Sequence, residues 1–308
     1  MRWLDYVRRD PVPWLLDPVN PSVRYLTLRD IFRKPDSELI EEQQRVLDWA
    51  PVVKLRTHWD PLHHWGRAGD PYYGGPLGTL GTLYLLAQLG APPFSEAQAS
   101  CEQLLAYGRR NDGYLAPRGG TAIPPIGLTG MALRILHHFG FGDHPITQAA
   151  CRRLVATVQQ APDTLGQAIA DHATCAAAIK ALESLLRMAD TVEDRTTAME
   201  ILGRYLLAYP YDWAGRDARW LILRFPRFYD SDLSELCHTL AQTPFRETPE
   251  FEGLVQRLGQ QQNAEGYWVK RKPTLALDWE PPMHPSRWLT YEAIHTLILT
   301  YGDDRYAP

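Results

Sequence analysis

The sequence is poor in cysteine and lacks the cysteine spacings that hold metal clusters or disulfide frameworks. Its four cysteines, at positions 101, 151, 175 and 237 of 308 residues, are far apart and form no CxxC pair. They are therefore predicted to be buried, reduced thiols. The N-terminal segment MRWLDYVRRDPVPWLL also lacks the long apolar run of a signal peptide or membrane span. We expect a cytoplasmic protein with no transmembrane segment.

An excess of positive charge is also missing. The chain has 32 Lys and Arg against 36 Asp and Glu, a net charge of -4, and no basic cluster, which argues against nucleic acid as a partner. What the chain has in abundance is aromatic residues and proline, with 10 Trp, 15 Tyr and 25 Pro. So many rings need a large core or an aromatic-lined cavity. So many prolines predict many helix ends.

A repeat with a period of 50 residues organises the middle of the chain. TLGTLYLLAQLG (79–90) aligns without a gap with TGMALRILHHFG (129–140), and the same shift aligns EAQASCEQLL with ITQAACRRLV. The first helix of each unit is apolar nearly all round, as a helix buried on both faces should be, and it stops at Gly90 or Gly140. The second helix carries more charge, which is typical of an outer position.

Weaker copies extend the repeat to both ends of the chain. First helices are predicted to start near residues 21, 77, 126, 172, 230 and 285, which gives six units of roughly 50 residues. The last unit has almost no second helix, and the N-terminal segment RWLDYV is available to complete the outer layer. We therefore predict an all-α fold, a single α/α toroid of about six helical hairpins over residues 1–308, with residues 1–20 packing on the ring.

The turns between units carry a second pattern. RRNDGYLAP (109–117) and QQNAEGYWV (261–269) both place Asn, an acid, Gly and an aromatic residue in order, which is strong turn chemistry. This pattern resembles the repeats of the squalene-cyclase and prenyltransferase superfamily, whose signature is Gln, an acid, Gly and Trp. The matching residues are Gln262, Glu265, Gly266 and Trp268, with Tyr267 inserted, and in part Asp112, Gly113 and Tyr114. The resemblance implies an α/α toroid, in a short, single-toroid member with degraded motifs.

The same resemblance implies a catalytic acid. Class II cyclases of the superfamily donate a proton from the middle Asp of an Asp-x-Asp-Asp motif, and the nearest match here is YDSDL, with Asp230 and Asp232. Asp232 would then be the proton donor, although Leu233 replaces the last Asp. The alternative is structural, because Asp232 followed three residues later by Glu235 is a capping-box pattern at a helix start.

Other reactions known on toroids find less support. The Asp-x-Cys zinc pair of protein prenyltransferases is absent, and Cys237-His238 with Cys175 only distantly resembles the zinc set of lanthionine-type cyclases. No cofactor is therefore predicted. A carbohydrate-active enzyme with paired carboxylates is another alternative. Its candidate acids near inner-helix starts are Asp60, Asp70, Asp171, Asp230, Asp232, Asp278 and Glu280.

Aromatic residues gather near the predicted starts of the inner helices. They either stabilise carbocations in a central cavity or fill the junctions between layers. They are Tyr72, Tyr73, Trp213, Trp220, Tyr229, Trp279, Trp288 and Tyr291. We therefore predict an aromatic-lined cavity for an apolar, isoprenoid- or lipid-like ligand. The protein would be a terpenoid-cyclase-like isomerase or lyase, or a non-catalytic scaffold for a partner protein.

HWDPLHHWG (58–66) allows two interpretations. Its three histidines and one aspartate are metal-ligand side chains within seven residues. The stretch also precedes a predicted inner helix, as the two Asn-Gly turns do, so Trp65-Gly66 would anchor a turn. The turn is favoured, because a metal site needs converging ligands with supporting partners. If a metal binds this protein, His58, His63 and His64 are the ligands to examine.

Overall fold

The computed structural model describes residues 2–117, 125–160, 171–189, 192–271, 279–303 and 305–306. Every regular element within these ranges is a helix, and the only β-type pairings among these residues are isolated bridges. The predicted all-α fold is confirmed. Among the described residues, no helix combines the length and the apolar character needed to cross a membrane.

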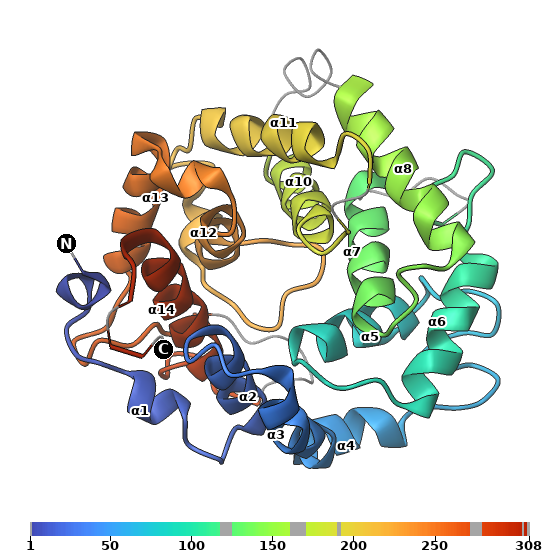
Figure 1. The fold of residues 1–308 in the computed structure, drawn as a ribbon, viewed down its shortest axis with the longest axis horizontal. Coiled ribbons are helices and arrows are strands. Elements are labelled where there is room, and N and C mark those ends of the chain that lie inside the picture. Colours follow the sequence, from blue (N-terminus) through green and yellow to red (C-terminus); the bar gives the residue numbers. More distant parts are fainter. Residues whose placement is uncertain are drawn as a thin grey trace.

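Six helices surround the centre of the molecule (Figure 1). They are α2 (Pro21–Asp30), α5 (Thr79–Gln88), α7 (Pro125–His138), α10 (His172–Leu185), α12 (Leu233–Ala241) and α14 (Arg287–Tyr301). Each begins within three residues of a start predicted from the repeat. All ten residues of α5 are buried, as expected for a helix covered on every side.

A second layer of helices lies outside the first (Figure 1). It contains α3 (Asp36–Asp48), α4 (Ala50–Thr57), α6 (Ser95–Tyr107), α8 (Pro145–Gln160), α11 (Arg195–Ala208) and α13 (Pro249–Gly259). These helices are amphipathic. In α13 the buried residues are Phe251, Leu254, Val255 and Leu258, a helical spacing that places them on the face toward the inner layer.

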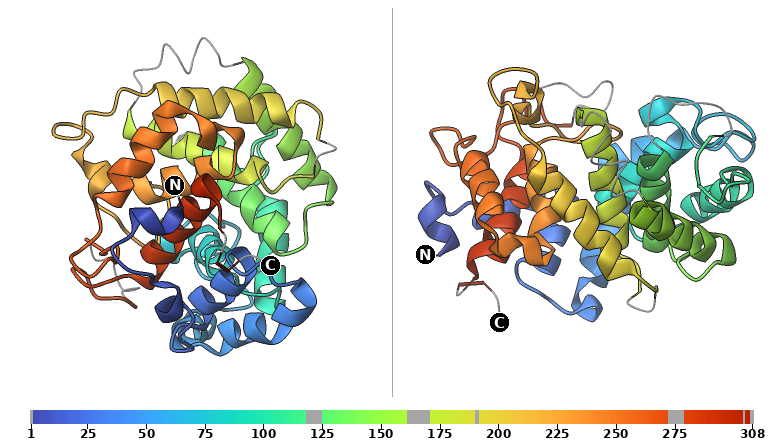
Figure 2. Two further views of the ribbon diagram at one scale, coloured as in Figure 1. Left: turned by 60° about the vertical axis from the view of Figure 1, so that its left-hand side comes forward. Right: turned by 90° about the horizontal axis from the view of Figure 1, so that it is seen from above.

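The N-terminal segment packs beside the last helix of the chain. The short helices η1 (Trp3–Tyr6) and α1 (Val12–Leu15) contact α14, and Figure 2 shows the N-terminal end of the chain close to this last helix. Trp3 is fully buried, and the ring of Tyr6 stacks on that of Tyr301 with centroids 4.0 Å apart. The N-terminal residues therefore occupy the outer position that the last unit lacks.

Two tryptophans anchor the turns between units in the same way. The indole N–H of Trp268 donates to the carbonyl of Leu258 at 2.9 Å, and that of Trp65 donates to the carbonyl of Leu55 at 2.8 Å. Each bond ties a turn to a residue ten positions earlier, near the end of the preceding outer helix. Gly266, with φ of +86°, supplies the left-handed residue that the first of these turns requires. HWDPLHHWG is thus a turn of the same construction.

Replacing Trp268 with Phe should lower the free energy of unfolding by about 1–3 kcal/mol, because the buried carbonyl of Leu258 loses its donor. Denaturant titration measures this. The control is Trp213→Phe, since the half-buried Trp213 makes no hydrogen bond through its indole among the described residues. Equal losses in the two variants would show that the indole hydrogen bond does not stabilise the turn.

Candidate functional site

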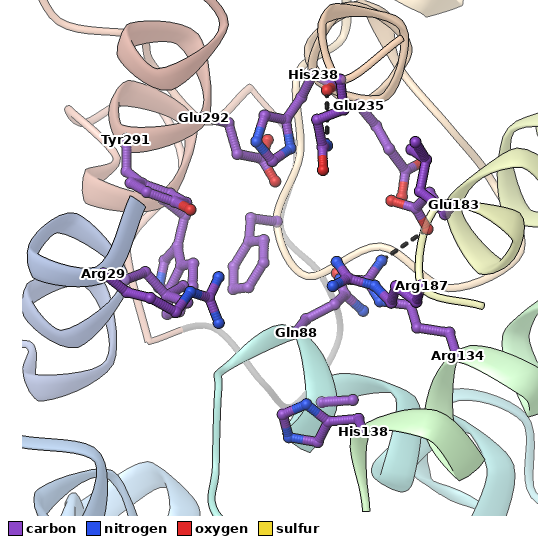
Figure 3. Close-up of a pocket in the computed structure, with 16 residues that line it drawn as sticks. Arg29, Gln88, Arg134, His138, Glu183, Arg187, Glu235, His238, Tyr291 and Glu292 are labelled. Atoms are coloured by element: carbon purple, nitrogen blue, oxygen red, sulfur yellow. Dashed lines mark hydrogen bonds and ion pairs between the residues drawn. The ribbon is translucent and has the colours of Figure 1, made fainter. Parts of the chain in front are cut away.

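All six inner helices contribute side chains to one pocket at the centre of the ring. Its volume is about 60 Å³, which is room for a few water molecules. The lining is mostly polar and comprises Leu26, Arg29, Ala87, Gln88, Arg134, His138, Glu183, Leu186, Arg187, Phe225, Glu235, His238, Gln242, Trp288, Tyr291 and Glu292. Figure 3 shows the labelled charged and polar groups facing a common space.

The segment between η3 (Ala218–Leu221) and α12 crosses the middle of the ring (Figure 1). Two of its residues fix it there. Phe225 lines the pocket and stacks on Trp288 with ring centroids 4.2 Å apart. The backbone carbonyl of Arg227 accepts a hydrogen bond of 2.9 Å from Gln88 on α5. The crossing segment therefore forms part of the pocket wall, which no repeat unit supplies.

Arg227 links this segment to two inner helices. Its two terminal nitrogens donate to both oxygens of Glu292 on α14, each at 2.7 Å, and its Nε donates to Asp232 at 3.0 Å. Arg227 and Asp232 are 1% and 0% exposed. Burial of a guanidinium is costly unless it is paired, and here both carboxylates face it.

Asp232 occupies the N-cap of α12, and its carboxylate also accepts from two other groups. Its oxygens accept from the backbone N–H of Glu235 at 3.1 Å, the backbone N–H of Arg224 at 2.8 Å and the Nε of Arg227. It does not line the pocket. Asp230 is exposed and pairs with Arg224 at 2.8 Å. The contacts of Asp232 are those of a helix N-cap, as the structural alternative expects. Neither Asp230 nor Asp232 lines the central pocket.

Replacing Asp232 with Asn should lower the free energy of unfolding by about 3–5 kcal/mol, because Arg227 stays buried with one carboxylate removed. The matched control is Asp230→Asn, which removes an exposed pair and should cost about 0–1 kcal/mol. Thermal and denaturant unfolding of both variants provide the measurement. A melting temperature of the Asp232 variant equal to that of the Asp230 variant would contradict the structural role of Asp232.

Carboxylates and cations form a network on the α7, α10 and α12 walls. Glu183 accepts from Arg134 at 2.7 Å and from the hydroxyl of Tyr84 at 2.8 Å. Burial favours the neutral form of Glu183, but Arg134 and Lys180 outweigh it and lower its pKa to about 2. Glu235 pairs with Lys180 and accepts from Ser231 at 2.5 Å. Its pKa is nevertheless raised, first by burial and then by the repulsion from Glu183, against the opposing effect of Lys180.

Three arginines point into the pocket, and only one of them has no counter-ion. Arg29 makes two bonds of 2.7 Å to Asp30, and Arg134 pairs with Glu183. The guanidinium of Arg187, just beyond the end of α10, makes no hydrogen bond or ion pair with any described residue. Part of the Arg187 residue stays in contact with solvent. Its pKa is lowered to about 10, first by desolvation and then by the positive charge of Arg134.

The guanidinium groups of Arg29 and Arg187 approach the central space from opposite sides (Figure 3). Close like charges repel, and the repulsion falls when an anion lies between them. Guanidinium groups also bind carboxylate and phosphate in a bidentate geometry. The arrangement is therefore suited to an anion.

The histidines of the pocket are neutral at pH 7. Burial lowers the pKa of both His138 and His238 to about 4 and is the largest cause in each case. His238 shares a hydrogen bond of 3.0 Å with His295, whose pKa is lowered to about 3, again mainly by burial. The cationic charge in the described lining of the pocket thus comes from its arginines.

Protonation of these histidines should destabilise the fold as pH falls. Their pKa is about 4 in the folded protein and near 6.5 when unfolded, so the unfolded chain binds more protons between these values. The free energy of unfolding is therefore unaffected by these histidines above pH 6.5 and decreases as pH falls toward 4. Unfolding titrations from pH 7 to 4 should show this loss, and His238→Gln should reduce it. His58→Gln, at an exposed site, should leave this loss of stability unchanged. Equal effects of the two variants would show that the buried histidines are not its cause.

The eight candidate aromatic residues lie in different environments. Trp288 and Tyr291 line the central pocket, and the Tyr291 hydroxyl donates to Asp30. Trp279 packs edge-on against Trp49 at 5.3 Å, in another part of the molecule. The others fill junctions or reach solvent: Trp220 is buried beside His172, Trp213 stacks on Tyr211, Tyr72 and Tyr229 are half-buried, and Tyr73 is 54% exposed.

The remaining candidate acids and histidines have local partners. Asp60 pairs with His63, Asp70 accepts from the backbone of Tyr72, Asp171 caps α10, and Glu280 accepts from the start of α14. Asp278 lies outside the described residues. His58 and His64 contact the carbonyl of Lys54 and the hydroxyl of Ser100. Cys175 and Cys237 are buried. In the described part of the chain, no three His, Cys, Asp or Glu side chains converge as a metal site would require.

The residues that dominate the pocket are absent from the sequence-based candidates. Arg134, Glu183 and Glu292 are charges inside largely apolar helices, in MALRILHH, IKALESLL and LTYEAIHT. A charge in a helix buried on both sides must have a partner or face a cavity. The sequence therefore indicates that these charged residues need partners or a cavity, but it does not show which of them lie close together.

The comparisons with known proteins add no assignment. No family model matches the chain, and neither a curated protein nor a solved structure shows significant similarity to it. The described helices form a two-layered ring with a charged central pocket. Functional inference therefore depends on the pocket itself.

Proposed function

We propose that this chain is an α/α-toroid protein whose central pocket binds a small molecule through an anionic group, a carboxylate or a phosphate. The observation that carries the proposal is the guanidinium of Arg187, which has no ion-pair partner among the described residues and lies beside Arg134 and across the pocket from Arg29. The other two cations of the described lining have carboxylate partners, Arg29 with Asp30 and Arg134 with Glu183. Behind the lining, Lys180 pairs with Glu235 and Arg227 with Glu292.

The energetic argument favours an anion over a neutral ligand. Desolvation and neighbouring cations make the charged form of Arg187 unfavourable, and this is why its pKa is lowered. A bound anion offsets both effects, because it supplies the missing counter-charge and accepts several N–H bonds at once. A neutral apolar ligand would instead leave the guanidinium unpaired.

The size of the pocket restricts what enters it. A volume of about 60 Å³ accommodates a head group and excludes a long hydrocarbon chain. An isoprenoid- or lipid-like ligand, as the superfamily resemblance implies, would therefore bind through a phosphate or carboxylate head. Its apolar part would remain outside the polar centre.

A second candidate function is acid–base catalysis on the bound anion. Glu235 and His238 project from α12 into the same space as the arginines (Figure 3). The raised pKa of Glu235 suits a proton donor, and the neutral imidazole of His238 suits a proton acceptor. In an enzyme of this kind these two residues, and not Asp232, would exchange protons with the substrate.

Calorimetric titration with inorganic phosphate and acetate tests the proposal. The wild-type protein should bind one of these anions, and Arg187→Gln should weaken that binding by about 10- to 100-fold, as expected for loss of a charged hydrogen-bond donor. Arg152→Gln is the matched control, because Arg152 is exposed on the outer helix α8 and faces no central pocket. It should leave the affinity unchanged.

The same variants give an independent readout of stability. The folded pKa of Arg187 lies below its unfolded value, so at any pH below about 10 its charge opposes folding. Arg187→Gln should therefore melt at or above the wild-type temperature without anion, and should lose the stabilisation that anions give. A lower melting temperature, or undiminished stabilisation by anions, would reject the assignment.

A further inference from the structure

A second cavity lies away from the central pocket, beside the N-terminal half of α5. Its volume is about 410 Å³, within the range of small-molecule sites. It is lined by Pro51, Lys54, Leu55, His58, Trp65, Leu77, Thr82 and Trp279. The central pocket contacts α5 at Ala87 and Gln88, near the other end of this helix, so the two cavities share no lining residue.

Rigid apolar groups form the walls of this cavity. Pro51 and Leu55 lie four residues apart on α4 and so face the same side. Trp65 is 8% exposed and is fixed by its bond to the carbonyl of Leu55. Trp279 is supported by its edge contact with Trp49. These contacts hold two indole rings in place, as a preformed binding site requires.

The mouth of the cavity leaves apolar surface in water. Leu77, at the end of η2 (Gly75–Leu77), is 42% exposed, and Trp279 is half-buried. Covering such surface contributes about 25 cal/mol for each Å² removed from water. The hydroxyl of Thr82 needs no hydrogen bond from a ligand, because it donates to the carbonyl of Leu77 at 3.3 Å. The interior is therefore suited to an apolar group.

The charge at this cavity is positive. Lys54 is exposed, and its ammonium makes no ion pair or hydrogen bond with the described residues. His58 uses Nδ1 on the carbonyl of Lys54, at 2.6 Å, which leaves Nε2 available. None of the residues identified in the lining is acidic. A ligand that complements both features has an apolar body and an anionic head.

We propose that this cavity, formed by α4, the turn 58–66, Leu77, Thr82 and Trp279, binds an amphipathic organic acid. The apolar chain lies between Trp65 and Trp279, and the carboxylate pairs with Lys54 at the rim. The inference goes beyond the function proposed for the central pocket and does not depend on it.

Titration with dodecanoate, below its critical micelle concentration, tests this site by calorimetry and tryptophan fluorescence. Wild-type protein should bind it saturably. Leu77→Glu, which places a carboxylate at the apolar mouth, should weaken binding by about tenfold or more, equivalent to about 1.4 kcal/mol. The matched control is Leu62→Glu, because Leu62 is a 65% exposed leucine of the same connection outside the cavity lining.

Lys54→Gln tests the head group. It should weaken dodecanoate binding by about two- to fivefold, as loss of an exposed ion pair does, and should leave dodecanol binding unchanged. Lys34→Gln, at an exposed lysine of the first outer unit, should affect neither ligand. Arg187→Gln should keep the dodecanoate binding that depends on Leu77 and Lys54, which separates this site from any carboxylate binding in the central pocket.

Three results would overturn the proposal. The first is absence of saturable dodecanoate binding to the wild-type protein. The second is equal weakening by Leu77→Glu and Leu62→Glu, since the effect would then not arise in the cavity. The third is equal weakening of dodecanoate and dodecanol by Lys54→Gln, which would remove the anionic head from the proposal. Circular dichroism of each variant verifies that it is folded.

Discussion

The buried guanidinium of Arg227 is the interaction on which the centre of the molecule depends. This side chain joins Asp232 at the start of α12 to Glu292 on α14. The backbone carbonyl of Arg227 also accepts a hydrogen bond from Gln88 on α5. Three helices from distant parts of the chain are thereby fixed around this one residue. Because a buried ion pair contributes little net stability compared with apolar packing, we attribute to it the placement of these helices and not the bulk of the folding energy.

The repeat made much of the architecture predictable from sequence. Apolar residues on nearly every side indicate an inner helix. A Pro, Asp or Ser at the boundary indicates its start, as at Pro21, Asp232 and Ser286. The anchoring role of Trp65 also followed from its place before an inner helix. These features depend on local chemistry, which a sequence records directly.

The pocket was not predictable in the same way. Its charges come one or two at a time from five of the six inner helices, and part of its wall is Phe225 in the crossing segment, which lies between repeats. Asp232 illustrates the difficulty, because an N-cap and a catalytic acid need the same residue at the same place. Only the positions of Arg224 and Arg227 reveal which contacts the carboxylate makes.

The closure of the ring by the N-terminal segment has a consequence for the order of folding. Trp3 donates a hydrogen bond to Asp303, a contact between residues 300 positions apart, and Tyr6 stacks on Tyr301. During synthesis these N-terminal groups emerge first but have no partner until α14 has been made. Local hairpins can form as each unit leaves the ribosome, whereas contacts of such long sequence separation form slowly. We infer that the growing chain passes through an open arc of hairpins with an uncovered edge, and that closure is its last event.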